Sequence, residues 1–124
     1  MRRIFPTPQD AEAAFYDALE RNDLDAMMEV WADDEEIVCV HPSGPRLAGY
    51  EQVRETWARV FGSGQRLKVR VSDLVAIVSG MFAVHSLHEN IRVPNDRTTA
   101  VTAATNIYAR SSDGWRSVVM PHRP

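Results

Sequence analysis

The chain has 124 residues, a single cysteine and a formal net charge of −3, and 44% of its residues are hydrophobic. A chain of this length forms one domain and buries about two-thirds of its unfolded surface without needing a disulfide or a metal. Lys and Arg are scattered rather than clustered, which argues against a nucleic-acid partner. The first residues lack the apolar stretch of a secretory signal, and no apolar run approaches the roughly 18 residues of a membrane helix. We expect a single domain over residues 1–124, located in the cytoplasm.

The pattern predicts three helices in the first half of the chain. Thr7 can cap the first helix, whose apolar residues recur at helical spacing as far as Leu19. A second and shorter helix carries an apolar stripe that ends at Trp31. A third helix follows Gly49 and is stopped by the Gly-Ser-Gly sequence at residues 62–64.

The remaining segments favour strands. Residues 37–41 form a short β-prone run, and residues 67–71 alternate apolar and charged side chains as a half-buried strand does. The alternation shifts near Asp73, which indicates a β-bulge. Further strands are predicted over residues 81–93, 97–110 and 115–120. Helices followed by an antiparallel meander predict an α+β domain with the helices packed on one face of the sheet.

Five segments, in this order and spacing, resemble the NTF2-like superfamily, in particular its SnoaL-like and ketosteroid-isomerase-like branches. These are residues 22–28 followed by 31–34, then 38–44, 47–51, 104–108 and 114–116. The resemblance covers nearly the whole chain. It implies a cone, in which three N-terminal helices pack on a curved antiparallel sheet and the mouth holds a small, mostly apolar molecule. It also implies a homodimer that pairs through the outer face of the sheet.

His41 is the predicted catalytic base. Isomerase-like members carry an Asp before the proline that follows the first strand, and this chain has His41 before Pro42. Neutral imidazole is an effective general base near pH 7. An extended strand places His41 on the same face as Ile37 and Cys39, which points it into the core or the pocket. The alternative is a histidine at a strand end that hydrogen-bonds the backbone.

Two further histidines compete for the interior. His85 and His88 are three residues apart, so a strand places them on opposite faces and they cannot share a metal ion. If His88 faces the cone, the even-numbered residues from Phe82 face it too. If His85 does, its companions are Ala83 and Leu87. Both sets are apolar enough to be buried, and we favour His88 as the pocket residue.

The other predicted ligand-binding residues lie on helices and on the closing strands. Asn106 shares a strand face with Ala104 and Tyr108, where its amide can orient a ligand carbonyl or satisfy a backbone group. The Tyr16 hydroxyl can reach the cone as a donor, and the aromatic residues can line its wall or fill the core. These predicted residues are Phe15, Tyr16, Trp31, Trp57 and Met120.

Two functions remain open at this point. The first is a small-molecule-binding protein that performs isomerase, cyclase or dehydratase chemistry by proton transfer, without a cofactor or a metal. The sequence contains no glycine-rich phosphate loop and no zinc-ligand spacing. The second is a non-catalytic dimerisation or association module. In that case Phe15, Trp31 and Trp57 would fill the cone, and the outer sheet face would carry the function.

Overall fold

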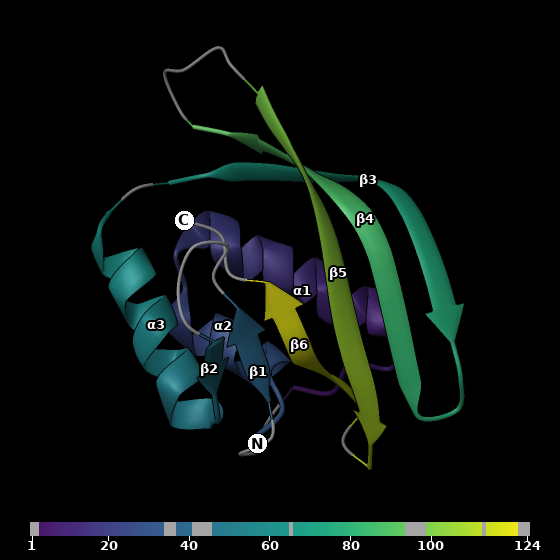
Figure 1. Cartoon of the computed structure of the whole chain (residues 1–124). Coiled ribbons are helices and arrows are strands. Elements are labelled where there is room, and N and C mark those ends of the chain that lie inside the picture. Colours follow the sequence, from purple (N-terminus) through teal and green to yellow (C-terminus); the bar gives the residue numbers. More distant parts are fainter. Residues whose placement is uncertain are drawn as a thin grey trace.

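The structure, a computed structural model, describes residues 3–33, 37–40, 46–64, 66–93, 99–112 and 114–121. Within these residues lie three helices and six strands (Figure 1). In chain order they are α1 (Pro8–Arg21), α2 (Leu24–Val30), β1 (Val38–Val40), β2 (Arg46–Ala48), α3 (Tyr50–Gly62), β3 (Lys68–Val78), β4 (Phe82–Arg92), β5 (Thr99–Ser111) and β6 (Gly114–Pro121). None of the described helices is long and apolar enough to cross a membrane.

Side-chain caps fix where the first two helices begin. The Thr7 hydroxyl accepts a hydrogen bond from the backbone N–H of Asp10 (3.1 Å), and proline occupies the first turn. Asn22 ends α1 in the left-handed region, at a φ of 52°. The Asp23 carboxylate then accepts from the backbone N–H of Ala26 (3.0 Å) and begins α2. The helix start predicted at Thr7 is therefore confirmed.

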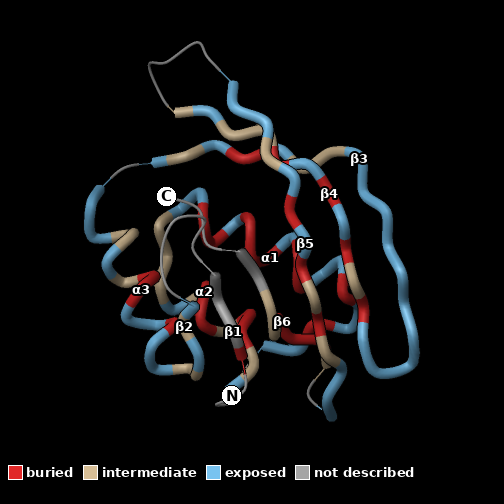
Figure 2. Tube along the Cα trace, viewed as in Figure 1, coloured by how far each residue is buried: buried red, intermediate tan, exposed pale blue. Residues whose placement is uncertain are grey.

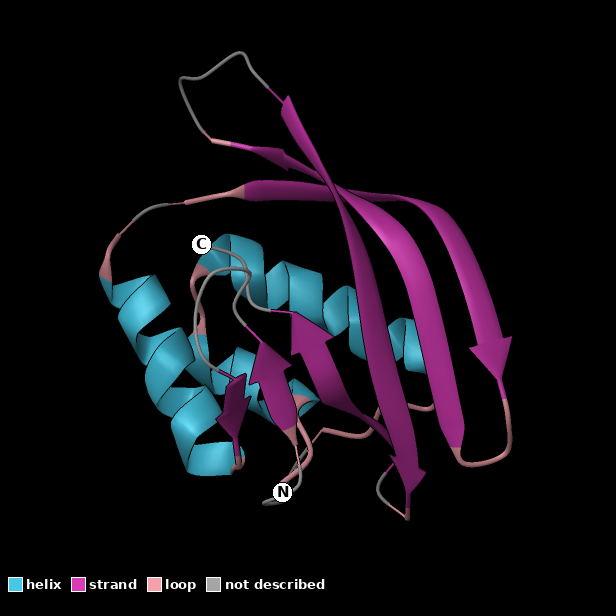
Figure 3. Ribbon diagram, viewed as in Figure 1, coloured by secondary structure: helices cyan, strands magenta, loops and turns pink. Residues whose placement is uncertain are grey.

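The strands form one sheet in the order β2-β1-β6-β5-β4-β3. Strands β3 to β6 make an antiparallel meander, as the sequence predicts. The short strand β1 pairs antiparallel with β2 and parallel with β6, an arrangement that the sequence pattern did not indicate. Figure 3 shows the helices gathered on the side toward which the sheet curves. The predicted class, α+β with three helices on a curved sheet, is confirmed.

Strand β3 contains the predicted bulge. Its register with β4 shifts between Ser72 and Val75, and Asp73 takes a φ of 54°. A bulge bends its strand and increases the local twist. In Figure 1, β3 turns sharply along its length and passes over α1.

The core lies between the helices and the inner face of the sheet (Figure 2). Trp31 and Trp57 are fully buried, and Phe15 packs edge-to-face against Trp57 at 5.7 Å between ring centroids. In contrast, residues 73–82, which are the second half of β3, the turn and the first residue of β4, are all exposed. Large apolar side chains that are exposed there include Val75, Ile77 and Phe82.

Candidate functional site

The inner face of β4 and β5 carries buried polar side chains where apolar ones would be ordinary. Alternation along β4 buries His85 and Glu89, and alternation along β5 buries Asn106 and Tyr108. His85 and Asn106 are direct cross-strand partners. Helix α1 faces them with Glu12 and Tyr16, which are four residues apart and therefore lie on one side of the helix. We call these six residues the inner polar cluster.

One half of the cluster is built around Glu12. Its Oε2 accepts a hydrogen bond from the Tyr108 hydroxyl (2.9 Å) and lies 2.7 Å from His85 Nδ1. An ionised carboxylate can only accept, so beside ionised Glu12 the Nδ1 atom is the donor, and in the neutral form of the imidazole Nε2 then keeps the lone pair. His85 is fully buried, yet Nε2 has no hydrogen-bond partner among the described residues. Glu12 therefore orients His85 and leaves Nε2 available.

The other half is a chain of hydrogen bonds through Tyr16. The Tyr16 hydroxyl donates to Glu89 Oε2 at 2.6 Å, and Asn106 Nδ2 donates to the Tyr16 hydroxyl at 3.0 Å. All three residues are buried. A side-chain amide nitrogen has two hydrogens, and the bond to Tyr16 uses one of them.

Both cluster tyrosines are held in their neutral form. Burial raises the pKa of Tyr16 far above its usual range, and the nearby Glu89 carboxylate raises it further. Burial and then the Glu12 carboxylate likewise raise the pKa of Tyr108. The cluster therefore contains two protonated hydroxyl groups beside one imidazole and two carboxyl groups. Groups of these kinds act as general acids and bases in enzymes. Among the described residues, no group of three or more His, Cys, Asp or Glu side chains is arranged to hold a metal ion.

The preference for His88 as the inward-facing histidine was wrong. Its side chain is 47% exposed, and its Nδ1 lies 2.9 Å from the Asp73 carboxylate at the bulge. The inward set is the odd-numbered one, with Ala83, His85 and Leu87.

The structure brings Tyr16 and Asn106 together in the cluster and places the aromatic residues beside it. Phe15 contacts Tyr16 edge-to-face at 4.9 Å and connects the cluster to Trp57. Trp31 is buried in the same core. Ligand binding by these residues stays a prediction. His41 and the side chain of Met120 lie outside what the structure describes.

Sequence reasoning missed the two carboxylates, Glu12 and Glu89. Their signal was present in the spacing. Glu12 precedes Tyr16 by four residues on a helix, and Glu89 follows His85 by four residues on a strand. Either spacing places the pair on one face. Choosing His88 instead of His85 assigned Glu89 to the wrong side of the sheet.

Comparison with known proteins agrees with this architecture. The family model described as the SnoaL-like domain matches residues 9–121. A solved structure from Thiobacillus denitrificans, named as a candidate calcium/calmodulin-dependent protein kinase type II association domain, is 34% identical. It has a TM-score of 0.85 over 99% of this chain and 100% of that one. No curated protein matched this chain.

Two further solved structures share the fold. A candidate dehydratase of the NTF2-like family from Streptomyces avermitilis is 28% identical, with a TM-score of 0.80 over 90% of this chain and 88% of that one. An NTF2-like protein of unknown function from Pseudomonas putida is 16% identical, with a TM-score of 0.81 over 91% of this chain and 80% of that one. The chain belongs to the SnoaL-like domain family of the NTF2-like superfamily, whose fold supports small-molecule binding.

Proposed function

We propose that this protein binds a small, mostly apolar molecule against the inner polar cluster and transfers a proton on it. One observation carries the proposal: His85 Nε2 is buried without a partner in the described chain, while Glu12 holds the other ring nitrogen. A buried polar atom that lacks a hydrogen bond is costly and calls for an explanation. A ligand group that exchanges a proton with Nε2 supplies one.

The reaction that fits is proton abstraction beside a carbonyl. His85 Nε2 takes the proton from the carbon, and the resulting imidazolium is paired with the Glu12 carboxylate. The electron pair of the broken C–H bond moves onto the carbonyl oxygen. In this proposal the side-chain amide of Asn106, the cross-strand partner of His85, donates a hydrogen bond to that oxygen when the molecule binds. In a β,γ-unsaturated ketone, return of the proton to the far end of the double bond gives isomerisation. In a β-hydroxyketone, the enolate electrons form a C=C bond while the hydroxyl takes the proton from the imidazolium and leaves as water, which gives dehydration.

His41 stays the alternative base, and the aromatic residues Phe15, Trp31 and Trp57 are the proposed apolar wall. The reaction as written needs no cofactor. The cytoplasmic location stays a prediction.

Hydrogen–deuterium exchange at carbon tests the proposal without knowledge of the natural substrate. Small cyclic monoketones and β-hydroxyketones, whose uncatalysed exchange is slow, are incubated with the protein in D₂O, and loss of the α-proton signal is followed by proton NMR. We expect the protein to accelerate exchange for part of the panel and His85→Gln to abolish the acceleration. His88→Gln is the matched control because that histidine is on the outside and should leave the rate unchanged. Equal rates for the two variants would refute the assignment of His85.

Native mass spectrometry of freshly purified protein tests ligand binding itself. A retained small molecule would appear as an added mass, and its composition would show whether it contains a carbonyl group. Asn106→Leu, which removes both amide hydrogens from the cluster, should reduce the retained fraction. If a molecule is retained equally by Asn106→Leu and by the unaltered protein, it is bound elsewhere.

A second function, self-association through the outer face of the sheet, is favoured by a separate observation. The cross-strand pairs place Val75, Ile77, Phe82 and Val101 on the face opposite the helices, and each of these side chains is more than half exposed. Exposed apolar surface of this kind marks interaction sites. The similar Thiobacillus denitrificans protein is named as a candidate association domain. We propose that the partner is a second copy of this chain.

Charge introduced on that face tests the association. Ile77→Lys and Phe82→Lys together should convert a dimer to a monomer in sedimentation velocity or native mass spectrometry. Ile4→Lys is the control, because Ile4 is equally exposed and lies outside the sheet. A monomer in the unaltered protein, or a dimer that survives the double change, would exclude this interface.

A further inference from the structure

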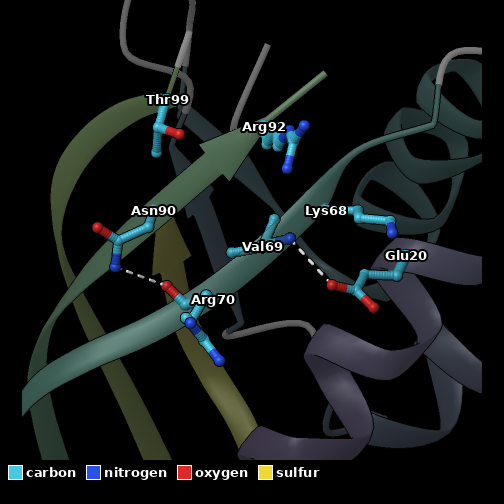
Figure 4. A pocket seen from close by; sticks show the side chains of 7 residues that line it. All are labelled: Glu20, Lys68, Val69, Arg70, Asn90, Arg92 and Thr99. Carbon is cyan, nitrogen blue, oxygen red and sulfur yellow. Dashed lines mark hydrogen bonds between the residues drawn. The ribbon is translucent and has the colours of Figure 1, made fainter. Parts of the chain in front are cut away.

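A cleft lies away from the inner polar cluster, beside the edge strand β3 (Figure 4). Its volume is about 730 Å³, within the range of small-molecule sites. It lies where the beginning of β3, the end of β4 and the beginning of β5 approach the last turn of α1. Its lining residues are Glu20, Lys68, Val69, Arg70, Asn90, Arg92 and Thr99.

Three cations, Lys68, Arg70 and Arg92, line this cleft. Lys68 and Arg92 are direct cross-strand neighbours, and Arg70 is on the same face two residues along. Like charges opposite each other on a sheet are unfavourable. None of the three makes an ion pair within the described part of the chain. Among the described residues no carboxylate pairs with these cations, and a negative charge bound between the side chains would relieve their repulsion.

The single carboxylate in the lining is already engaged. Glu20 Oε1 accepts a hydrogen bond from the backbone N–H of Val69 at 2.9 Å (Figure 4). This bond satisfies a donor on the edge strand and ties α1 to β3. Three cations against one carboxylate leave an excess of two positive charges in the cleft.

Neutral polar groups complete the lining. Asn90 Nδ2 donates to the Arg70 carbonyl and to Ser72 Oγ, both at 2.9 Å, which fixes the amide between β3 and β4. Thr99, the cross-strand partner of Arg92, contributes a hydroxyl. Hydrogen bonds from charged donors to carboxylate or phosphate oxygens are among the strongest in proteins.

We propose that this cleft binds a small oxyanion that carries two or more negative charges on carboxylate or phosphate groups. The whole chain has a net charge of −3, so it has no general attraction for anions and the effect is local. The site is distinct from the proposed reaction site, because Asn90 points to the opposite side of β4 from its neighbour Glu89. Binding here does not require His85.

Titration with citrate and with pyrophosphate tests the proposal and distinguishes the two sources of negative charge. Binding is measured by calorimetry at low ionic strength and again at about 0.15 M salt, where exposed charges are screened beyond about 8 Å. We expect saturable binding of at least one probe. The triple variant Lys68→Ala/Arg70→Ala/Arg92→Ala should weaken it about tenfold or more, as expected when charge-assisted hydrogen bonds are lost.

A second triple variant separates a site from general electrostatics. Arg54→Ala/Arg59→Ala/Arg110→Ala removes the same charge from exposed positions outside the cleft. It should bind as the unaltered protein does, and so should His85→Gln. Circular dichroism on each variant shows that it is folded. Binding of citrate alone assigns carboxylates, binding of pyrophosphate alone assigns phosphates, and binding of both assigns the shared oxyanion chemistry. Binding of neither probe, or equal weakening by the two triple variants, overturns the proposal.

Discussion

Replacing Tyr16 with phenylalanine removes one oxygen atom from the centre of the inner polar cluster. The Tyr16 hydroxyl donates to Glu89 at 2.6 Å and accepts from Asn106 at 3.0 Å, so both partners lose a hydrogen bond while staying buried. Leaving a buried polar group without its partner costs about 1–3 kcal/mol, and more when the group is charged. Glu89 has a further interaction, which limits its share of the loss. We therefore expect Tyr16→Phe to lower the free energy of unfolding by about 2–4 kcal/mol.

Urea unfolding at one fixed protein concentration measures this loss. The slope of the unfolding free energy against urea is about 1–3 kcal/mol per molar for small proteins, so the midpoint should fall by about 1–2 M. Tyr50→Phe is the control, because Tyr50 is only half-buried and belongs to no part of the cluster. Its effect should stay within about 0.5 kcal/mol. If both variants lose the same small amount of unfolding free energy, the Tyr16 hydroxyl does not stabilise the folded protein through the inner polar cluster, and the reasoning is refuted.

Three further predictions concern pH and backbone geometry. The raised pKa values of Tyr16 and Tyr108 mean that both keep their protons above pH 10 in the folded protein, whereas the unfolded chain loses them there. Above pH 10 each tyrosine should therefore lower the free energy of unfolding by about 1.4 kcal/mol per pH unit. Urea unfolding from pH 9 to 11 should show a shallower fall in Tyr108→Phe, and equal slopes would contradict the linkage. Gly114→Ala should lower the free energy of unfolding by about 2 kcal/mol or more, because φ is +95° and a Cβ would lie 2.6 Å from the Phe5 carbonyl oxygen. Gly80→Ala is the control and should change this free energy little, because a Cβ there has no atom within 4 Å. Asp73→Val should lower the free energy of unfolding by about 1–2 kcal/mol, because a β-branched residue disfavours the positive φ at this position, and Asp73→Gly should lower it less. Equal melting temperatures for the two variants would show that the backbone at the bulge changes conformation to accommodate valine.

Local signals made most of the fold predictable. The caps at Thr7 and Asp23 depend on residues within three positions of them, and the shift in alternation at Asp73 is visible in a few residues of sequence. Strand β2 was missed because three residues pair only with the equally short β1, and so short a run has no period to detect. The parallel pairing of β1 with β6 joins segments about 80 residues apart, and nothing local records it.

The candidate site was only half predictable, for a physical reason. The period of a strand fixes which residues share a face and does not fix which face is inside. In β4 both faces carry apolar residues, so the pattern could not choose between His85 and His88. The choice is made by α1, whose Glu12 reaches His85 across the core. Asn106 and Tyr16 were found because their neighbours in sequence already indicated a buried face.

The bulge divides the outward-facing side of β3 into two segments. Before it, Lys68, Arg70 and Ser72 point outward; after it, Val75 and Ile77 do, because the extra residues shift the alternation by one. Without the shift, Val75 and Ile77 would face the side of the helices, and the even-numbered residues of this segment would face outward. His88 contacts Asp73 at the bulge, so the histidine that was predicted to face the pocket lies on the outer face beside the bulge. One irregularity thus gives the same strand a basic segment for the proposed oxyanion and an apolar segment for the proposed partner.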